Sequence, residues 1–358
     1  MTRLIEVMIS LAIVLALFLV IGLVLPSSRH LAENVETNRK LTIVYDTLDS
    51  VHRFKDWNPL VLHDPRMHLK LSGPASGVGS RLDYSSDNPI VGSGSWTIVA
   101  NEPGQSVTYA ITNSQRGDNK RSTFVFRPTG HLGRNVEITQ TYSVDYGWDL
   151  MGRYAGMYVA RHVGDDIKLG LDRLTNMLAS VPNVDYRVQG SKLANLRTVD
   201  VPAENLLVVT AGSIVRDNDK IEASMKSNLE WIKRTMDANG LVAAGPMRII
   251  STELGRENYT FDVAQPVRRS AEAVAGAEPL TGIKLQGPVQ LAHVMPHRAA
   301  TASYTGYMAE LENVRNALRA WALTQGFEPT DRPYEVYKTG IDSAFTENGQ
   351  YDVYWTLK

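Results

Sequence analysis

Histidine and carboxylate side chains at helical spacing are the residues of this chain that could do acid–base or metal chemistry. His162 and Asp166 lie four residues apart in a helical pattern, where such pairs usually form surface contacts. His293 and His297 share that spacing, but Pro296 between them argues against a helical metal pair. The chain has no cysteine, which excludes a thiolate nucleophile and a sulfur-ligated metal. We therefore assign no catalytic residue, no metal ligand and no cofactor.

Composition narrows the classes of protein further. The chain has 358 residues with 37 basic and 38 acidic side chains, a formal net charge of -1. Sequence-independent nucleic-acid binding needs a broad positive field, so we expect no nucleic-acid partner. A hydrophobic content of 43% is enough for folded cores, and the length favours about two domains of roughly 150 residues.

An uncharged apolar segment, Val7 to Leu25, lies near the N-terminus. At about 1.5 Å per residue, a helix of this length just crosses a hydrocarbon layer of roughly 30 Å. The alternative is a cleaved signal peptide, but the apolar run is long for one and residues 26–29 offer no small-x-small cleavage pattern. We expect a single-pass membrane anchor and linker over residues 1–36. Basic residues on both sides leave the side of the membrane undecided.

The next block, residues 37–185, is expected to form one antiparallel sheet and a long helix. A helical stretch over residues 44–60 ends at Trp57-Asn58-Pro59. Segments with period-two alternation between turn residues follow, which is typical of antiparallel strands. They are residues 81–86, 92–101, 106–113, 122–128 and 136–144. An apolar stripe from Ala160 to Leu178 predicts a final helix around which the sheet curves.

Aromatic side chains on these elements are candidate ligand contacts in a cavity between sheet and helix. Those on strands are Trp96, Tyr109, Phe126 and Tyr142. Alternation does not say which sheet face is inside, so each is a ligand contact or else a core or surface residue. Trp57 is a further candidate, with the alternative that it plugs the rim while Asn58-Pro59 turns the chain.

This block resembles the START/polyketide-cyclase-like (SRPBCC) family. The resemblance rests on FKDWNPL, DPRMHLKLSG, GVGSRLDYSS, VGSGSW and GDDIKLGLDRLTNML, in the order and spacing of that family. It implies a helix-grip fold with an apolar pocket for lipids, polyketides or other hydrophobic compounds. Most members bind without catalysis.

The last block, residues 196–358, contains an internal repeat. Each half has a strand, an amphipathic helix and two further strands; the helices carry apolar stripes from Ile221 to Met236 and from Leu311 to Trp321. Asn239-Gly240 is an expected left-handed cap of the first helix. Each half has a glycine that ends its helix and a proline that opens the next strand. The sequence separation between the two glycines nearly equals that between the two prolines, which predicts duplicated β-α-β-β units.

This half resembles the GyrI-like small-molecule-binding domain of AraC-type effector domains, most closely over TGYMAELENVRNALRAWALTQGFEPTDRPYEVYKTG. The resemblance implies binding of amphipathic or cationic compounds between the repeats, at an acidic side chain among tyrosines. On the matching positions strand alternation places Glu335 with Tyr337, and Asp352 with Tyr354, each pair on one face. A buried carboxylate in an aromatic cage suits an organic cation, with Glu335 as first choice. Tyr304 and Tyr307 are further cage candidates or ordinary interface packing.

These observations predict an α+β protein: an N-terminal transmembrane helix, a helix-grip domain and a duplicated GyrI-like domain. The leading hypothesis is a membrane-anchored, non-enzymatic binder of small hydrophobic or amphipathic molecules, which senses, sequesters or transfers them. The alternatives are a polyketide cyclase/dehydrase-like enzyme or a small-molecule hydrolase using Glu335, and a signalling protein. The sequence names no protein partner and no specific ligand.

Overall fold

The computed structural model describes residues 2–187, 193–254, 257–270 and 278–358. The chain divides into two compact units, Met1–Val181 and Pro182–Lys358. Each unit is built on one large antiparallel sheet with helices, so the chain has the expected α+β class.

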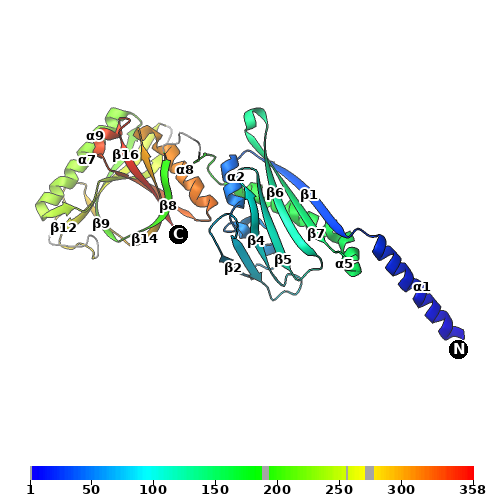
Figure 1. Ribbon diagram of the computed structural model, residues 1–358. Coiled ribbons are helices and arrows are strands. Elements are labelled where there is room, and N and C mark those ends of the chain that lie inside the picture. The colour runs from blue at the N-terminus through cyan, green and yellow to red at the C-terminus, as the bar shows by residue number, and fades with distance from the viewer. Residues whose placement is uncertain (1, 188–192, 255–256, 271–277) are drawn as a thin grey trace. The chain divides into compact units, whose positions relative to one another are not determined.

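The first element is the apolar helix α1 (Thr2–Val24), drawn in dark blue in Figure 1. It is long and apolar enough to cross a membrane, a property that it shares with signal sequences. Its side chains are mostly exposed because it packs against other elements only near its C-terminal end.

The sheet of the first unit has seven strands in the order β1-β7-β6-β5-β4-β3-β2. The strands are β1 (Ser28–Thr37), β2 (His68–Ser72), β3 (Arg81–Ser85), β4 (Ser93–Glu102), β5 (Ser106–Asn113), β6 (Asp118–Thr129) and β7 (Asn135–Asp145). The five segments predicted from alternation are β3 to β7, because β-branched and aromatic residues suit a half-buried pleated surface.

One strand of this sheet comes from the region that the sequence analysis assigned to the linker. Residues Ser28–Thr37 form β1, which pairs antiparallel with β7 from Ser28 opposite Asp145 to Thr37 opposite Val136. The segment SRHLAENVET is mostly polar, so no hydrophobic alternation identifies it. Its backbone completes the edge of the sheet through ladder hydrogen bonds instead.

The expected helix over residues 44–60 is three short helices. They are α2 (Leu41–Leu48), α3 (Phe54–Trp57) and α4 (Leu60–His63). The break follows Asp49, where the Ser50 hydroxyl accepts a hydrogen bond from the His52 backbone N–H and donates one to the Ala75 carbonyl. Serine side chains that bond to nearby backbone compete with helix continuation in this way.

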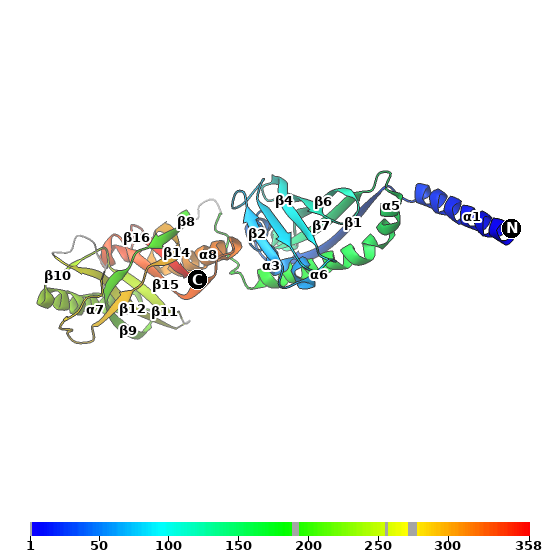
Figure 2. The same ribbon diagram turned by 90° about the horizontal axis from the view of Figure 1, so that it is seen from below.

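The unit ends with α5 (Leu150–Ala155), the 3-10 turn η2 (Gly156–Tyr158) and the long helix α6 (Val159–Ala179). Figure 2 shows α6 running alongside the sheet strands. Four residues of its predicted apolar stripe are buried: Ile167, Leu171, Leu174 and Leu178. Burying such side chains contributes about 1.5–3 kcal/mol each, which holds α6 against the sheet.

In the described ranges of the second unit, the sheet has nine strands. Eight follow the order β13-β9-β12-β11-β15-β16-β14-β8, and β10 pairs with β12. The strands are β8 (Leu193–Val201), β9 (Glu204–Val215), β10 (Leu241–Ala243), β11 (Arg248–Leu254), β12 (Asn258–Arg269), β13 (Gln290–Val294), β14 (His297–Thr305), β15 (Pro329–Tyr337) and β16 (Gln350–Leu357).

The described residues of this unit form three α-helices: α7 (Asn218–Asn239), α8 (Leu311–Thr324) and α9 (Gly340–Ala344). Helix α7 ends at Gly240 with a backbone φ of 61°, which confirms the expected left-handed cap. The buried faces of α7 and α8 share one apolar core with the strands, from Ile221 and Met225 on α7 to Leu311 and Leu318 on α8.

Candidate ligand-binding site

A cavity of about 130 Å³ lies between the sheet of the first unit and α6. The sheet contributes Tyr84, Trp96, Ile111, Asn113, Gln140 and Tyr142, and the loop between β5 and β6 contributes Gln115. Helix α6 contributes Val163, Asp166, Ile167 and Gly170, and residues 57–60 complete the lining. Four of these residues are aromatic and four carry amide groups, so the cavity can contact an apolar body while offering a few polar partners.

Alternation along β7 explains which side chains reach the interior. Val136, Ile138, Gln140, Tyr142 and Val144 are all buried, whereas the residues between them are only half-buried. Gln140 is the one amide in this inward-facing row. Burial raises the pKa of Tyr142, so its hydroxyl stays protonated across the neutral range and can donate a hydrogen bond.

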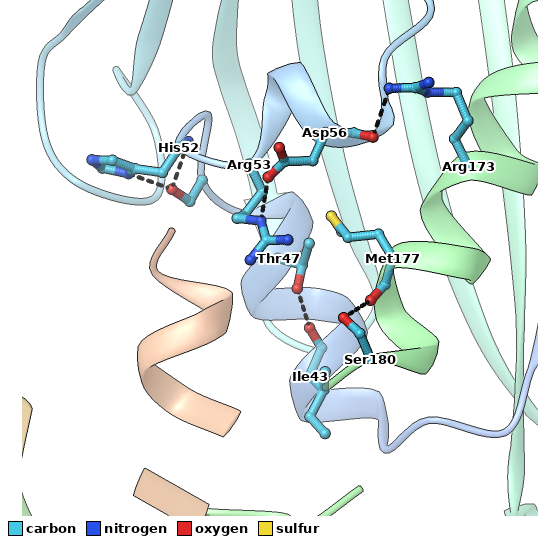
Figure 3. Close-up of polar contacts among 9 residues, drawn as sticks. Ile43, Thr47, His52, Arg53, Asp56, Arg173, Met177 and Ser180 are labelled. Carbon is cyan, nitrogen blue, oxygen red and sulfur yellow. Dashed lines mark hydrogen bonds and ion pairs between the residues drawn. The ribbon is translucent and has the colours of Figure 1, made fainter. Parts of the chain in front are cut away.

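Trp57 reaches the cavity because α3 is tied to α6. Arg173 on α6 donates from Nη2 to the Asp56 carbonyl at 2.9 Å and from Nε to the Trp57 carbonyl at 3.3 Å. Arg53, the residue before α3, pairs with the Asp56 carboxylate at 2.6 Å (Figure 3). The Asn58 side chain accepts a hydrogen bond from Leu60 N–H at 3.0 Å, which forms the turn expected at Asn58-Pro59.

Two of the lining residues carry a buried polar atom that lacks a hydrogen-bond partner among the residues that the structure describes. They are Trp57, through its indole Nε1–H, and Gln140, through its carbonyl Oε1. The Gln140 amide is oriented by Ser122, whose hydroxyl accepts from Nε2 at 3.0 Å. A buried unsatisfied polar group costs about 1–3 kcal/mol, and both atoms belong to residues that line the cavity.

Further polar groups surround these two. The Lys120 ammonium donates to Asn113 Oδ1 at 2.6 Å and to the Gln115 carbonyl, and its burial lowers the pKa of Lys120. On α6, Asp166 lies 3.3 Å from His63 Nε2, and this contact links α4 to α6. The histidine beside Asp166 is thus His63 rather than the sequence neighbour His162.

The predicted aromatic residues of this unit are divided between two places. Trp57, Trp96 and Tyr142 line the cavity. Tyr109 and Phe126 instead pack in the core: the Tyr109 ring lies 5.7 Å from that of Trp96, and the Phe126 ring lies 6.0 Å from that of Tyr45. The Tyr109 hydroxyl donates to the Leu48 carbonyl, so it already has a partner.

In the second unit Glu335 is completely buried. Its Oε1 accepts a hydrogen bond from Arg315 Nε on α8, and Arg315 also donates to the Tyr259 hydroxyl at 3.3 Å. Burial acts to lower the pKa of Arg315, but the charge of Glu335 and its hydrogen bond, together with Tyr259 and Tyr337, raise the pKa overall. The carboxylate proposed as receptor for an organic cation therefore already has an internal cation beside it.

The two predicted acid–tyrosine pairs of this unit lie on opposite faces of the sheet. Glu335 is opposite Val353 and Tyr337 is opposite Tyr351, on the core face. Asp352 and Tyr354 alternate with these residues on β16 and are half-buried. Asp352 accepts from Ser303 at 2.8 Å and pairs with Lys338 at 3.1 Å.

Tyrosine rings continue the core face next to Glu335. The Tyr351 ring lies 4.9 Å from that of Tyr337 and 5.8 Å from that of Tyr304. Burial raises the pKa of Tyr337 well above its usual value, and its hydroxyl lacks a hydrogen-bond partner in the described part of the chain. Tyr307 is 48% exposed and joins this group only through its carbonyl, which accepts from the Tyr304 hydroxyl at 3.4 Å.

A second hollow, of about 430 Å³, lies beside Tyr337. Apart from Tyr337 it is lined mainly by α7 and by the residues that lead into β11, among them Leu229, Met236, Pro246 and Met247. Glu335 is not among the lining residues, so this hollow offers apolar contacts and the tyrosine ring rather than the carboxylate.

The sequence analysis did not single out Gln140 or Arg315. Gln140 carries a usable signal, because it is a polar residue at an inward position of an otherwise apolar alternation. Arg315 carries none, since an arginine in an amphipathic helix normally belongs to the solvated face.

No family model and no curated protein matches the chain. Among solved structures, the EcmrR C-terminal domain matches with a TM-score of 0.35 and 15% identity, covering 46% of this chain and 97% of that one. Norcoclaurine synthase from Thalictrum flavum matches with a TM-score of 0.34 and 11% identity, covering 43% and 94%. A hydrolase from Listeria innocua matches with a TM-score of 0.33 and 12% identity, covering 46% and 92%. At these values the matches assign no function to the chain.

Proposed function

We propose that this protein is a membrane-anchored binding protein for small amphipathic molecules, held in the cavity between the first sheet and α6. The observation that carries the proposal is the pairing of an aromatic lining with two buried polar atoms, Trp57 Nε1–H and Gln140 Oε1, for which the described residues provide no hydrogen-bond partner. Roughly 90% or more of buried polar groups in folded proteins have a hydrogen-bond partner, so two unpaired atoms on the lining residues of one cavity favour a polar guest.

The size of the cavity limits the guest. At about 130 Å³ it is close to an apolar cavity of about 150 Å³ that accommodates benzene. It is smaller than the roughly 300–1,000 Å³ of pockets for drug-sized ligands. The guest that fits without opening the fold is therefore a single ring or short chain with at least one hydroxyl or carbonyl group.

The helix-grip arrangement of the first unit is part of this proposal. Residues of both the sheet and α6 line the cavity, as that arrangement requires. The duplication of the second unit is supported by its strand order. Outward from the central β11–β15 pair, the strands are β11, β12 and β9 on one side and β15, β16 and β14 on the other, so corresponding strands of the two halves take the same places. Its hollow beside Tyr337 is a second, more apolar candidate site.

Membrane anchoring through Val7–Leu25 is the remaining part of the proposal. The support is the exposure of the apolar side chains of α1, which are left without a core of their own. Transfer to a hydrocarbon layer would remove this surface from water at about 25 cal/mol per Å².

A pair of matched probes tests the binding site. We expect p-cresol to bind the full chain in detergent about tenfold more tightly than toluene, because one added hydrogen bond of about 1.4 kcal/mol changes affinity tenfold. Gln140→Leu should abolish this preference while retaining toluene binding. Thr139→Val, at a half-buried position on the opposite face of β7, should leave it unchanged.

Binding is measured by ligand-observed NMR. If neither probe binds the wild-type chain, the proposed site does not exist. If both bind but Gln140→Leu keeps the preference, the polar recognition is assigned to the wrong group. Native mass spectrometry of the purified chain then identifies small molecules that co-purify with it.

A further inference from the structure

The C-terminal end of α1 is joined to the first unit by direct packing. The Phe18 ring stacks on the Tyr154 ring at 4.7 Å with an interplanar angle of 10°, and the Tyr154 hydroxyl donates to the Phe18 carbonyl at 2.8 Å. Gly22 allows this approach, because a Cβ there would lie 3.3 Å from both Leu150 Cβ and a Tyr154 ring carbon. Figures 1 and 2 both show α5 at this end of α1.

The Arg153 side chain adds hydrogen bonds to this contact between α1 and α5, which we call the joint. Its guanidinium donates to the carbonyls of Gly22 at 3.3 Å, Leu23 at 3.0 Å and Leu25 at 3.2 Å, and to the Gly147 carbonyl at 2.6 Å. The last carbonyls of a helix have no partner within it, and a positive charge there is favourable. Because β1 begins at Ser28, only three residues separate α1 from the sheet, and the joint leaves little freedom between them.

Four large apolar side chains are exposed on the segment that forms this joint. They are Trp148 at 83%, Met151 at 56%, Met157 at 47% and Tyr158 at 59% exposure. The Arg153 guanidinium carbon lies 5.8 Å from the centroid of the Trp148 ring, so the group that caps α1 also contacts the most exposed aromatic residue. We call these four residues the α5 platform.

We propose that the α5 platform sits in the interfacial layer of the same bilayer that α1 crosses. The inference rests on the proposed anchoring by α1. Phe18 to Val24, against which α5 packs, span about 9 Å at 1.5 Å per residue. This length matches the roughly 5–10 Å by which interfacial helices enter the headgroup and acyl boundary. Tryptophan and tyrosine are the residues enriched at that boundary.

The platform places the candidate binding site near the lipid. Helix α6 begins at Val159, directly after Tyr158, and Val163 of its second turn lines the cavity. Tyr158 and Val163 are separated by about 8 Å along a helix at 1.5 Å per residue. A ligand partitioned into the interfacial layer is therefore within about two helical turns of the cavity wall.

The absence of cysteine from the chain makes a spin-label test direct. Single variants Trp148→Cys and Met157→Cys of the full chain carry nitroxide labels in phosphatidylcholine nanodiscs. Leu132→Cys is the matched control, since Leu132 is 82% exposed and follows β6 at the far end of the β6–β7 hairpin. Leu15→Cys on α1 reports whether the anchor itself is in lipid.

The measurement is the accessibility of each label to oxygen, which concentrates in lipid, relative to a water-soluble nickel chelate. We expect the ratio to be high at positions 15, 148 and 157 and low at 132. A high ratio at position 15 with low ratios at 148 and 157 would overturn the platform and leave the anchor intact. A low ratio at position 15 would overturn both, and a high ratio at 132 would show that the labels do not report a specific surface.

Discussion

Arg315 on α8 and Glu335 on β15 form an ion pair inside the second unit, with 8% and 0% of their side chains exposed. The Arg315 backbone carbonyl also accepts from Trp355 Nε1 at 2.9 Å, which fixes α8 against β16. A cationic ligand that used Glu335 would have to compete with Arg315 or displace it. Recognition of a cation at Glu335 would therefore require Arg315 to give up this ion pair.

Removing one member of this pair should destabilise the second unit strongly. Arg315→Met leaves the Glu335 carboxylate buried without its cation, and we expect a loss of about 3–5 kcal/mol. Hydrogen-exchange mass spectrometry of β15 and α8 peptides in the full chain measures the loss for this unit alone.

The double variant Arg315→Met/Glu335→Leu is the control for this prediction. Because apolar replacement of both partners removes the desolvation penalty as well as the attraction, it should recover most of the lost protection. Equal exchange in wild type and Arg315→Met would show that the pair carries no stability.

Alkaline pH should destabilise the first unit through its buried tyrosines. Burial, together with the charge of Asp49, raises the pKa of Tyr45 to about 12. An unfolded tyrosine has a pKa of about 10, so between these values the folded state holds the proton more tightly. The contribution of Tyr45 to stability is therefore complete below pH about 10 and is lost as the pH rises through about 12.

Urea unfolding monitored by circular dichroism at several pH values measures this decline. Tyr45→Phe should make the decline shallower, because the substitution removes one of the groups that titrate. Stability that stays constant from pH about 10 to about 12 would contradict the assignment.

The Arg153 cap should fix the angle between α1 and the first sheet. Arg153→Met removes every donor to the Gly22, Leu23 and Leu25 carbonyls while keeping side-chain length. We expect a broader distance distribution between nitroxides at positions 15 and 132 and a stability loss of about 1–3 kcal/mol. Arg161→Met, at an exposed position on α6, is the control. An unchanged distribution in Arg153→Met would mean that ring packing alone holds the joint.

Two glycines of α6 should respond in opposite ways to the same substitution. Alanine is favoured over glycine in helices by about 1 kcal/mol. At Gly164 the added Cβ would lie 3.9 Å from Leu31 Cδ1, an ordinary contact, so Gly164→Ala should stabilise. At Gly170 the added Cβ would lie 3.1 Å from Pro59 Cδ. Gly170→Ala should therefore not raise the stability, and it should push Pro59 from the cavity wall. Thermal unfolding midpoints of the two variants compare them directly.

The strands and helices that were predicted correctly are those with a hydrophobic pattern within their own segment. Alternation in residues 106–113 predicts β5, and an apolar stripe predicts α6, because each pattern reflects burial of one face. The prediction of one continuous helix over residues 44–60 was wrong, because the side chain of Ser50 forms hydrogen bonds with the backbone of His52 and Ala75. Polar β1 was missed because its pairing uses backbone groups that every residue has.

The sequence by itself determined the apolar N-terminal helix, the α+β class and the two sheets, since hydrophobic periodicity and turn residues are local properties. Only the tertiary structure decided that Glu335 has Arg315 as its partner and that Gln140 and Trp57 share one cavity. These residues lie far apart or on different elements, and the position of one side chain relative to another depends on strand order and helix docking. No pattern within one segment carries that information.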